Sequence, residues 1–207
     1  MITPGSILVV AATERELAAG PWRGLVCGVG PLEAAVATTM AIERERPAAI
    51  VHVGIAGARR DCGIGVGSLV IGARAIYCDA GLAPKWVSNV VDAPVHMIEA
   101  AQRALPGAAL GAIGTSARVG GSIATAIGDE SIAGVNAGVN IEAMEGFGVL
   151  FAAGKAKIPA IEVRAVSNEI EEADRAKWQF DAAFKAITDA TPALVTAIQQ
   201  AVWLANA

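Results

Sequence analysis

The sequence predicts a single α/β domain, residues 1–207, in which a central mixed β-sheet carries helices on both faces as three α/β/α layers. Short apolar and β-branched runs alternate along the chain with segments of helical periodicity, which is the order typical of this class. The 207 residues are 54% hydrophobic, enough for one large core. No linker, internal repeat or low-complexity stretch divides the chain.

The predicted strands are short apolar runs that end at turn or helix signals. After the first run, the spacing of Thr13 and Glu16 is that of a capping box and predicts a short helix to about Ala19. After the third run, Gly54 to Gly57 predicts a turn. The predicted strands cover residues 6–12, 25–29, 48–53, 68–78, 108–115, 139–143 and 160–166.

The predicted helices begin or end at proline in two places. Pro31 suits the first turn of a helix because its missing amide hydrogen is not needed there. Pro192 divides the apolar C-terminal region into two helices. Gly120 to Ser122 predicts a loop. The predicted helices cover residues 31–46, 94–105, 145–156, 179–190 and 192–204.

The overall charge and hydropathy exclude two classes of partner. The formal net charge is −4, and Lys and Arg are scattered, so we expect no nucleic-acid partner. No run of 18 or more apolar residues is present, so we expect no membrane span. The N-terminal residues lack a basic region before the first strand, so we expect no secretory signal and a cytoplasmic location.

Cysteine and histidine usage points away from disulfides and metals. Cys27, Cys62 and Cys78 are far apart and form no C-x-x-C pair, which favours reduced thiols. His52 and His96 have no neighbours at metal-ligand spacing, so we expect no metal site. His52 lies in an apolar run, which predicts a hydrogen-bonded core residue.

No nucleotide-cofactor motif follows the predicted strands. The first strand is not followed by G-x-G-x-x-G, and the chain contains no Walker A sequence, so we expect no cofactor. Polar residues instead follow three strands: Glu16, the pair Met144-Glu145 and the pair Ser167-Asn168. In open α/β sheets ligands bind at the carboxyl ends of strands, so these residues are the candidate site.

Four segments of the chain, taken in their order and spacing, resemble those of a known family. They are Ala12-Thr-Glu-Arg-Glu16, Gly54-Ile-Ala-Gly-Ala58 with the strand after it, Ile141-Glu-Ala-Met-Glu-Gly146 and Val163-Arg-Ala-Val-Ser-Asn168. Together they resemble the purine nucleoside phosphorylase and nucleosidase superfamily, over residues 7 to about 187. The resemblance implies a nucleoside phosphorylase-like fold and cleavage of the N-glycosidic bond of a small nucleoside, with no cofactor.

The resemblance assigns a role to each candidate residue. Breaking an N-glycosidic bond passes through an oxocarbenium-like sugar. Glu16 aligns with the glutamate that activates water, although the sequence also fits a capping partner of Thr13. Glu145 would accept hydrogen bonds from the ribose hydroxyls, or be an ordinary first-turn glutamate. Met144 would pack beneath the sugar, or belong to the core.

The remaining positions implied by the resemblance are Ala56, Gly57 and Ser167 at the substrate. Asn168 stands where adenine-specific nucleosidases have aspartate. An amide offers two N–H donors to the N7 and O6 acceptors of a 6-oxopurine, so Asn168 favours hypoxanthine over adenine. The alternative for Asn168 is a turn residue that bonds its own backbone.

The segment after Asn168 resembles one branch of the superfamily more than the others. Asp174, Arg175 and Trp178 follow it in a pattern that is similar to the futalosine hydrolases of menaquinone biosynthesis, a branch of the superfamily. Trp178 would pack against the aryl group of the nucleoside, or anchor the start of a helix. Two alternatives stay open: an adenine-releasing nucleosidase for methylthioadenosine, adenosylhomocysteine or aminofutalosine, and a catalytically silent nucleoside-binding protein.

Water is the expected nucleophile. The bacterial phosphorylases of the superfamily carry a Gly-Asp-Pro-x-Arg loop after the first strand, whereas the corresponding loop here is acidic and would repel phosphate. The sequence does not choose which basic residue meets the aryl carboxylate; the candidates are Arg59, Arg60, Lys85 and Arg118. The resemblance also implies a homo-oligomer.

Overall fold

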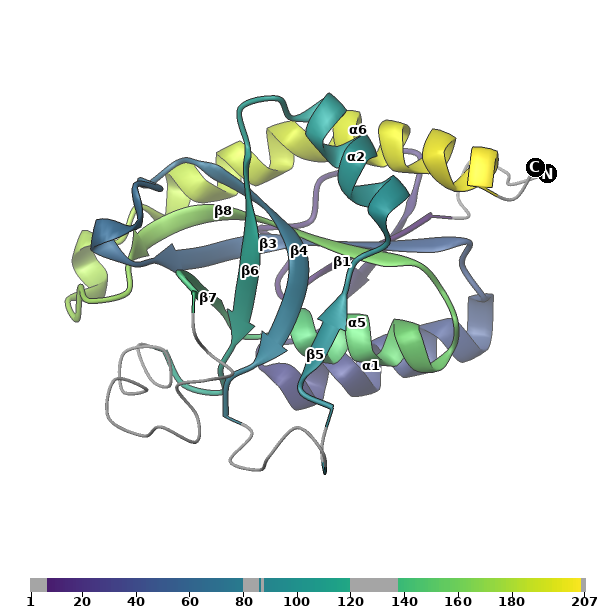
Figure 1. The fold of residues 1–207 in the computed structure, drawn as a ribbon, viewed down its shortest axis with the longest axis horizontal. Helices are drawn as coiled ribbons and strands as arrows, with labels where there is room; N and C mark the ends of the chain where they lie inside the picture. Colours follow the sequence, from purple (N-terminus) through teal and green to yellow (C-terminus); the bar gives the residue numbers. More distant parts are fainter. Residues whose placement is uncertain (1–6, 80–85, 87, 120–137, 206–207) are drawn as a thin grey trace.

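A mixed eight-stranded sheet forms the centre of the protein (Figure 1). The computed structural model describes residues 7–79, 86, 88–119 and 138–205. The strands are β1 Ile7–Ala11, β2 Arg23–Val26, β3 Ala49–Ala58, β4 Leu69–Tyr77, β5 Val90–Asp92, β6 Ala109–Thr115, β7 Ile141–Ala143 and β8 Ala160–Glu169. The helices are α1 Pro31–Glu45, α2 Val95–Ala104, α5 Gly146–Lys155 and α6 Phe180–Ala205, with 3₁₀ turns η1 Arg60–Cys62 and η2 Arg175–Lys177.

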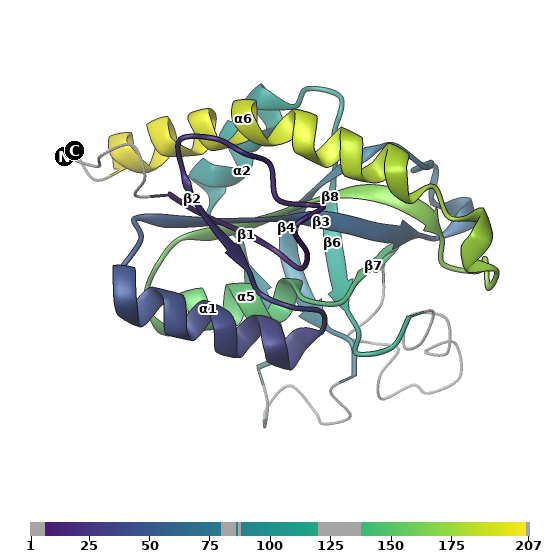
Figure 2. The same cartoon turned by 180° about the vertical axis from the view of Figure 1, so that it is seen from behind.

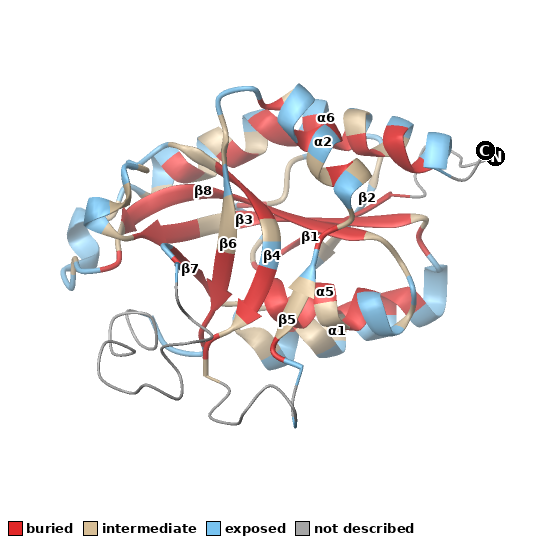
Figure 3. Cartoon of the chain, in the orientation of Figure 1, coloured by how far each residue is buried: buried red, intermediate tan, exposed pale blue. Residues whose placement is uncertain are grey.

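Helices cover both faces of the sheet, which confirms the predicted α/β/α layers with a mixed sheet. Helices α1 and α5 lie on one face, and α2 and α6 lie on the other (Figures 1 and 2). Alternate residues of β1 serve the two faces. Ile7 and Val9 pack in the cluster that includes α2 and α6, and Leu8 and Val10 pack in the cluster that includes α1 and α5. The central strands are therefore buried on both sides (Figure 3), which explains their continuous apolar runs.

Five strands of the sheet pair with one another in a closed ring. Strand β3 pairs in parallel with β8, β8 pairs antiparallel with β4, and β4 pairs in parallel with β6. Strand β7 completes the ring because it pairs in parallel with β6 and antiparallel with the end of β3, where Gly57 lies opposite Glu142. The ring brings the carboxyl-terminal ends of β3 and β8 beside β7, whereas β1 joins the outer edge of β3.

The predicted turn at residues 54–57 is wrong, because β3 continues through it. Glycine is required at positions 54 and 57 because side chains of β8 pack closely against the backbone of β3, and not because the chain turns. A Cβ on Gly54 would overlap the Arg164 guanidinium, and one on Gly57 would lie 3.0 Å from Asn168 Nδ2. A register shift between Ala56 and Gly57 marks a bulge at the same place.

The two predicted C-terminal helices are one helix of 26 residues with Pro192 inside it. Ile187 before the proline and Leu194 and Ile198 after it are all fully buried on the face that packs on the sheet. Burial of this continuous face outweighs the roughly 3 kcal/mol cost of an interior proline.

Smaller differences occur near the ends of the sheet. The predicted short helix after β1 is only a turn, in which the Glu16 amide donates to Thr13 O at 3.2 Å. Strand β2 begins before the predicted 25–29 segment, β8 extends beyond residue 166, and β5 was not predicted. The predicted loop at residues 120–122 lies outside the described residues.

The contact between α1 and α5 depends on a glycine. A Cβ on Gly148 would overlap Pro31 O of α1, whereas one on Gly154, exposed on the same helix, would meet nothing within 4 Å. We expect Gly148→Ala to lower the free energy of unfolding by about 1–3 kcal/mol, because overpacking outweighs the gain in helix propensity. Gly154→Ala should raise it by about 0.5–1 kcal/mol. Urea denaturation measures both, and equal effects of the two substitutions would contradict the close packing of α1 on α5.

Candidate active site

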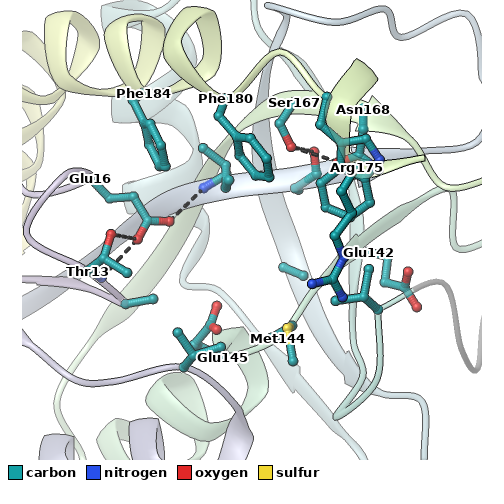
Figure 4. A pocket seen from close by; sticks show the side chains of 18 residues that line it. Thr13, Glu16, Glu142, Met144, Glu145, Ser167, Asn168, Arg175, Phe180 and Phe184 are labelled. Atoms are coloured by element: carbon teal, nitrogen blue, oxygen red, sulfur yellow. Dashed lines mark hydrogen bonds between the residues drawn. The ribbon is translucent and has the colours of Figure 1, made fainter. Parts of the chain in front are cut away.

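A cavity of about 290 Å³ lies at the carboxyl ends of β1, β3, β7 and β8 (Figure 4). Its walls combine carboxylates, one guanidinium and an aromatic cluster. The lining residues are Ala12, Thr13, Glu16, Val29, Ile55, Ala56, Gly57, Val119, Glu142, Ala143, Met144, Glu145, Ser167, Asn168, Arg175, Trp178, Phe180 and Phe184. All eight residues predicted from the sequence are among them, because the ring brings the ends of β3, β7 and β8 together and β1 runs alongside β3.

Glu16 is held rigidly at the turn that follows β1. Its Oε2 atom accepts hydrogen bonds from Thr13 N at 2.9 Å and Thr13 Oγ1 at 2.7 Å, and its Oε1 atom accepts one from Ile55 N at 3.2 Å. The side chain is only 3% exposed. The capping-type contact with Thr13 is therefore real, and it orients a carboxylate that also faces the cavity. An ionised carboxylate has about four acceptor sites, so one is left for a ligand or a water molecule.

Glu145 faces the cavity from another side, at the residue before α5 (Figure 4). Its Oε1 atom accepts from Gly30 N at 3.1 Å, and its Oε2 atom accepts from Arg164 Nη2 at 3.3 Å. Gly30 has a φ of 103°, a conformation that favours glycine, and this turns its amide toward the carboxylate. The side chain of Glu145 makes no cap bond to α5, so its remaining acceptor sites face the cavity. Met144 lines the cavity beside it.

A buried arginine connects the carboxylates. Arg164 is fully buried on β8, and its Nε donates to Glu162 Oε1 at 2.7 Å. Burial disfavours its charge, but the carboxylates of Glu162, Glu145 and Glu16 outweigh that effect and raise its pKa. Burial in turn raises the pKa of Glu162, although Arg164 acts in the opposite direction. Arg164 therefore stays charged and fixes one oxygen of Glu145.

His52 completes this cluster as the hydrogen-bonded core residue that the sequence predicts. Its Nδ1 atom donates to Val10 O at 3.0 Å in the neutral tautomer that leaves Nε2 as the acceptor of Arg164 Nη2 at 2.5 Å. Burial and the neighbouring Arg164 charge lower the pKa of His52 well below 6.5. A protonated ring would place two cations in contact, so the neutral form is part of the folded structure.

Ser167 and Asn168 lie at the end of β8. The Ser167 hydroxyl is 2.8 Å from Asn168 Oδ1 and 3.2 Å from Ala56 O. Asn168 Nδ2 donates to Glu169 O at 2.9 Å, so one of its two N–H groups is already used and one remains for a ligand. The serine contact to Oδ1 fixes the amide with its nitrogen beside Gly57.

An aromatic wall lines the cavity, formed by the predicted Trp178 together with Phe180 and Phe184, which the sequence did not predict as site residues. Trp178 stands against Phe180 with ring centroids 5.5 Å apart, and Phe180 stacks on Phe184 at 6.1 Å. Trp178 Nε1 donates to Glu172 O at 3.0 Å, so the residue also anchors the segment before α6. Phe180 and Phe184 are four residues apart at the start of α6, a spacing that indicates one helix face but does not distinguish a cavity wall from core.

Of the basic candidates for a carboxylate partner, Arg59 and Arg60 line a second cavity of about 280 Å³, which shares Asn168 with the first. Arg60 pairs with Glu169 at 2.7 Å. Arg118 does not line the first cavity, and Lys85 lies outside the described residues. The basic residue that does line it is Arg175, which the sequence analysis noted only as part of a pattern.

The described residues hold neither a metal-binding cluster nor an activated Cys27 or Cys78 thiol. No group of three or more His, Cys, Asp or Glu among them is arranged to hold a metal ion. Burial raises the pKa of Cys27 to about 12, assisted by Glu145, and burial and Asp79 do the same for Cys78. Cys27, Cys62 and Cys78 form no disulfide among the described residues. None of the described helices combines the length and the apolar character needed to cross a membrane.

Two comparisons of the sequence with known proteins found matches over most of the chain. Residues 14–200 match the model of the phosphorylase superfamily. The chain is 34% identical over 195 residues to the futalosine hydrolase of Streptomyces coelicolor, covering 86% of this chain and 80% of that protein.

Solved structures show the same fold. A 5′-methylthioadenosine/S-adenosylhomocysteine nucleosidase of Neisseria meningitidis in complex with methylthio-immucillin-A is 25% identical, with a TM-score of 0.75 and coverage of 93% and 97%. The futalosine hydrolase of Helicobacter pylori is 14% identical, with a TM-score of 0.74 and coverage of 93% and 98%.

The neutral state of His52 makes stability depend on pH. The unfolded chain binds a proton at this histidine below about pH 6.5, whereas the folded protein does not, so folding stability falls as pH drops. Between pH 7 and pH 5 this contribution amounts to about 2 kcal/mol. We expect urea denaturation of His52→Gln to show a smaller loss over that range than the wild type.

His96, the other histidine, provides the control for this measurement. It lies on α2, away from the Arg164 cluster, and His96→Gln should keep the wild-type loss. The same pH dependence in His52→Gln and wild type would contradict a neutral His52 in the folded protein.

Proposed function

This chain belongs to the phosphorylase superfamily, and we propose that it is an N-glycosyl hydrolase that cleaves futalosine and releases hypoxanthine, a step of menaquinone biosynthesis. One observation carries the proposal. Glu16, held by three donors, and Glu145, held by Arg164 and Gly30, face the same cavity from different elements. The identity to the Streptomyces coelicolor enzyme directs the choice of substrate.

The first step in the proposed mechanism is activation of water. The free acceptor site of Glu16 would hold a water molecule, and the carboxylate would take its proton as the oxygen bonds to C1′ of the ribose. Glu145 would accept hydrogen bonds from the ribose hydroxyls with the acceptor sites that Arg164 and Gly30 leave open. Met144 would pack beneath the sugar. The bond from C1′ to N9 breaks as the sugar gains oxocarbenium character.

The base would be recognised by Asn168. Its unused N–H group points to the purine edge in this proposal, and the Ser167 contact keeps the amide from turning over. An amide cannot transfer a proton, but hypoxanthine leaves as a delocalised anion and is then protonated by water. Ala56 and Gly57 would border the base, and the aromatic wall at Trp178 would pack against the 5′ aryl group.

The charges around the cavity favour water over phosphate. Glu16, Glu142 and Glu145 line it, and Arg175 is the one basic residue that does so in the described chain. A phosphate dianion would be repelled by such a cavity. This supports hydrolysis over phosphorolysis.

A second candidate activity is release of adenine from 5′-methylthioadenosine, S-adenosylhomocysteine or aminofutalosine. Two observations favour it: the similarity to the Neisseria meningitidis nucleosidase, and the single free N–H of Asn168, which matches one acceptor of the base and not two. Product analysis with futalosine and these three nucleosides separates the candidates. Faster release of adenine than of hypoxanthine would overturn the choice of futalosine.

We also propose that the protein is a homo-oligomer in the cytoplasm. The outer face of α1 carries apolar residues four positions apart, Leu32, Val36 and Met40, which are 79%, 59% and 49% exposed. A contiguous exposed stripe of this kind is typical of a protein interface. The wide spacing of the three cysteines, with no C-x-x-C pair, is typical of proteins of a reducing compartment.

Glu16→Gln should lower kcat for hypoxanthine release by about 100-fold or more, because the amide cannot take the proton of water. Binding of the nucleoside, measured by calorimetry, should persist. Glu14→Gln is the matched control, because Glu14 is exposed on the same turn and does not line the cavity. Unchanged kcat in Glu16→Gln would show that Glu16 does not activate water.

Asn168→Asp should shift the preference from 6-oxopurine toward 6-aminopurine nucleosides, since a protonated aspartate can transfer its proton to N7 of the departing adenine, which an amide cannot do. The measurement is the ratio of kcat/KM for futalosine and aminofutalosine. An unchanged ratio would remove Asn168 from base recognition.

Val36→Glu should dissociate the oligomer, because it places a charge in the middle of the apolar stripe. Val95→Glu is the control, since Val95 is also well exposed, at 69%, but lies on α2. Sedimentation equilibrium measures the mass of each variant. A monomeric wild-type protein would contradict the proposal.

A further inference from the structure

The proposed mechanism leaves one charged group of the cavity unused. Arg175 lines the cavity from η2, and Figure 4 shows its guanidinium extending into the space on the side away from Glu16. The same cavity is lined by three carboxylates. A guanidinium in acidic surroundings normally pairs with one of them.

Arg175 makes no ion pair with a carboxylate of the described residues. Its guanidinium lies over the ring of Trp178, with Cζ 5.7 Å from the centroid. Other exposed arginines do find carboxylates, at distances of 2.6 to 2.9 Å; these are Arg15, Arg23, Arg60 and Arg74. The five N–H donors of Arg175 are therefore open to a ligand in the cavity.

The backbone that carries Arg175 is fixed. Asp174 caps η2, because its Oδ1 atom accepts from Ala176 N at 3.0 Å, and Lys177 N donates to Asp174 O at 3.1 Å. The Trp178 indole closes the segment through its bond to Glu172 O. The guanidinium is thus presented from an ordered turn.

The aromatic wall lies directly beside this guanidinium. Trp178 contacts both Arg175 and Phe180, and Phe180 stacks on Phe184. Flat apolar surface next to an open guanidinium fits an aryl group that carries an anionic substituent. A neutral aryl group would pack against the aromatic wall but would leave the Arg175 guanidinium without an anionic partner.

We propose that Arg175 binds the carboxylate of the substrate's aryl group and thereby selects acidic nucleosides over neutral ones. This inference rests on the proposed function, because it concerns the 5′ substituent of futalosine. Arg175 is the only cation among the described residues that line the cavity, so an anionic substituent is directed to its end and the pair fixes the orientation of the bound substrate. The planar guanidinium matches a carboxylate with two parallel hydrogen bonds, which an ammonium group cannot form.

The test compares futalosine with its carboxamide, in which the aryl carboxylate is replaced by a neutral group of the same shape. We expect the wild type to prefer futalosine by about tenfold in kcat/KM, with the difference in KM. Arg175→Gln should bring this ratio to about one, and Arg175→Lys should retain part of it. The preference of the wild type should also shrink as salt is added.

Lys177→Gln is the matched control. It removes a positive charge from the same 3₁₀ turn, but Lys177 pairs with Glu172 and does not line the cavity. It should keep the wild-type ratio. A ratio in Arg175→Gln equal to that of the wild type overturns the inference, as does an equal loss in Lys177→Gln.

If the protein does not hydrolyse futalosine, the outcome differs from a failure of carboxylate recognition by Arg175. In that case the wild type releases no hypoxanthine from futalosine, and calorimetry of the two compounds then decides the inference. Tighter binding of futalosine than of the carboxamide, lost in Arg175→Gln, supports carboxylate recognition without turnover. Equal binding of the two compounds, or no binding of either, overturns it.

Discussion

The candidate site depends on one buried charge, the guanidinium of Arg164. It lies among Glu162, Glu145 and His52 with no exposure to solvent, and a buried charge is tolerated only when its partners are all in place. The lowered pKa of His52 follows from this constraint, since a second cation has no room there. The same guanidinium passes over Gly54, so β3 carries no side chain at that point. The Arg164 guanidinium therefore links strands β3 and β8 to Glu145 and holds that carboxylate in position.

The ring of strands places chemistry from distant parts of the chain at one edge. Strand β3 is the common neighbour of β1, β7 and β8, so the residues that follow or end these strands converge. Glu16 is tied to β3 through the Ile55 amide, and Asn168 lies against Gly57 of the same strand. The carboxylates of Glu16 and Glu145 each accept a hydrogen bond from backbone of another segment, at Ile55 and Gly30. A small displacement of β3 would thus move Glu16 and disturb the packing of Asn168 against Gly57.

The carboxylates that line the cavity affect both the nucleophile and the binding of the substrate. They make water a better nucleophile than phosphate, and they make a single open cation the only place for an anionic substituent among the described lining residues. Arg175 and Trp178 belong to η2 and its end, and Phe180 and Phe184 to α6, whereas the groups assigned to the sugar and the base follow or end β1, β7 and β8. Recognition of the substituent and cleavage of the bond are therefore assigned to separate elements.

The sequence by itself predicted the layered fold, because apolar periodicity is a local property, and its resemblance to a known family singled out eight residues that the structure brings to one cavity. It did not determine that β3 continues through Gly54 to Gly57 or that α6 continues through Pro192. Glycine and proline mark turns in isolation, but here the packing of Arg164 and the burial of a helix face outweigh that preference. Nor did it separate Phe180, Phe184 and Arg175 from ordinary core and surface residues. Only the tertiary structure decided this, because lining a cavity depends on which elements meet around it and not on the identity of any one residue.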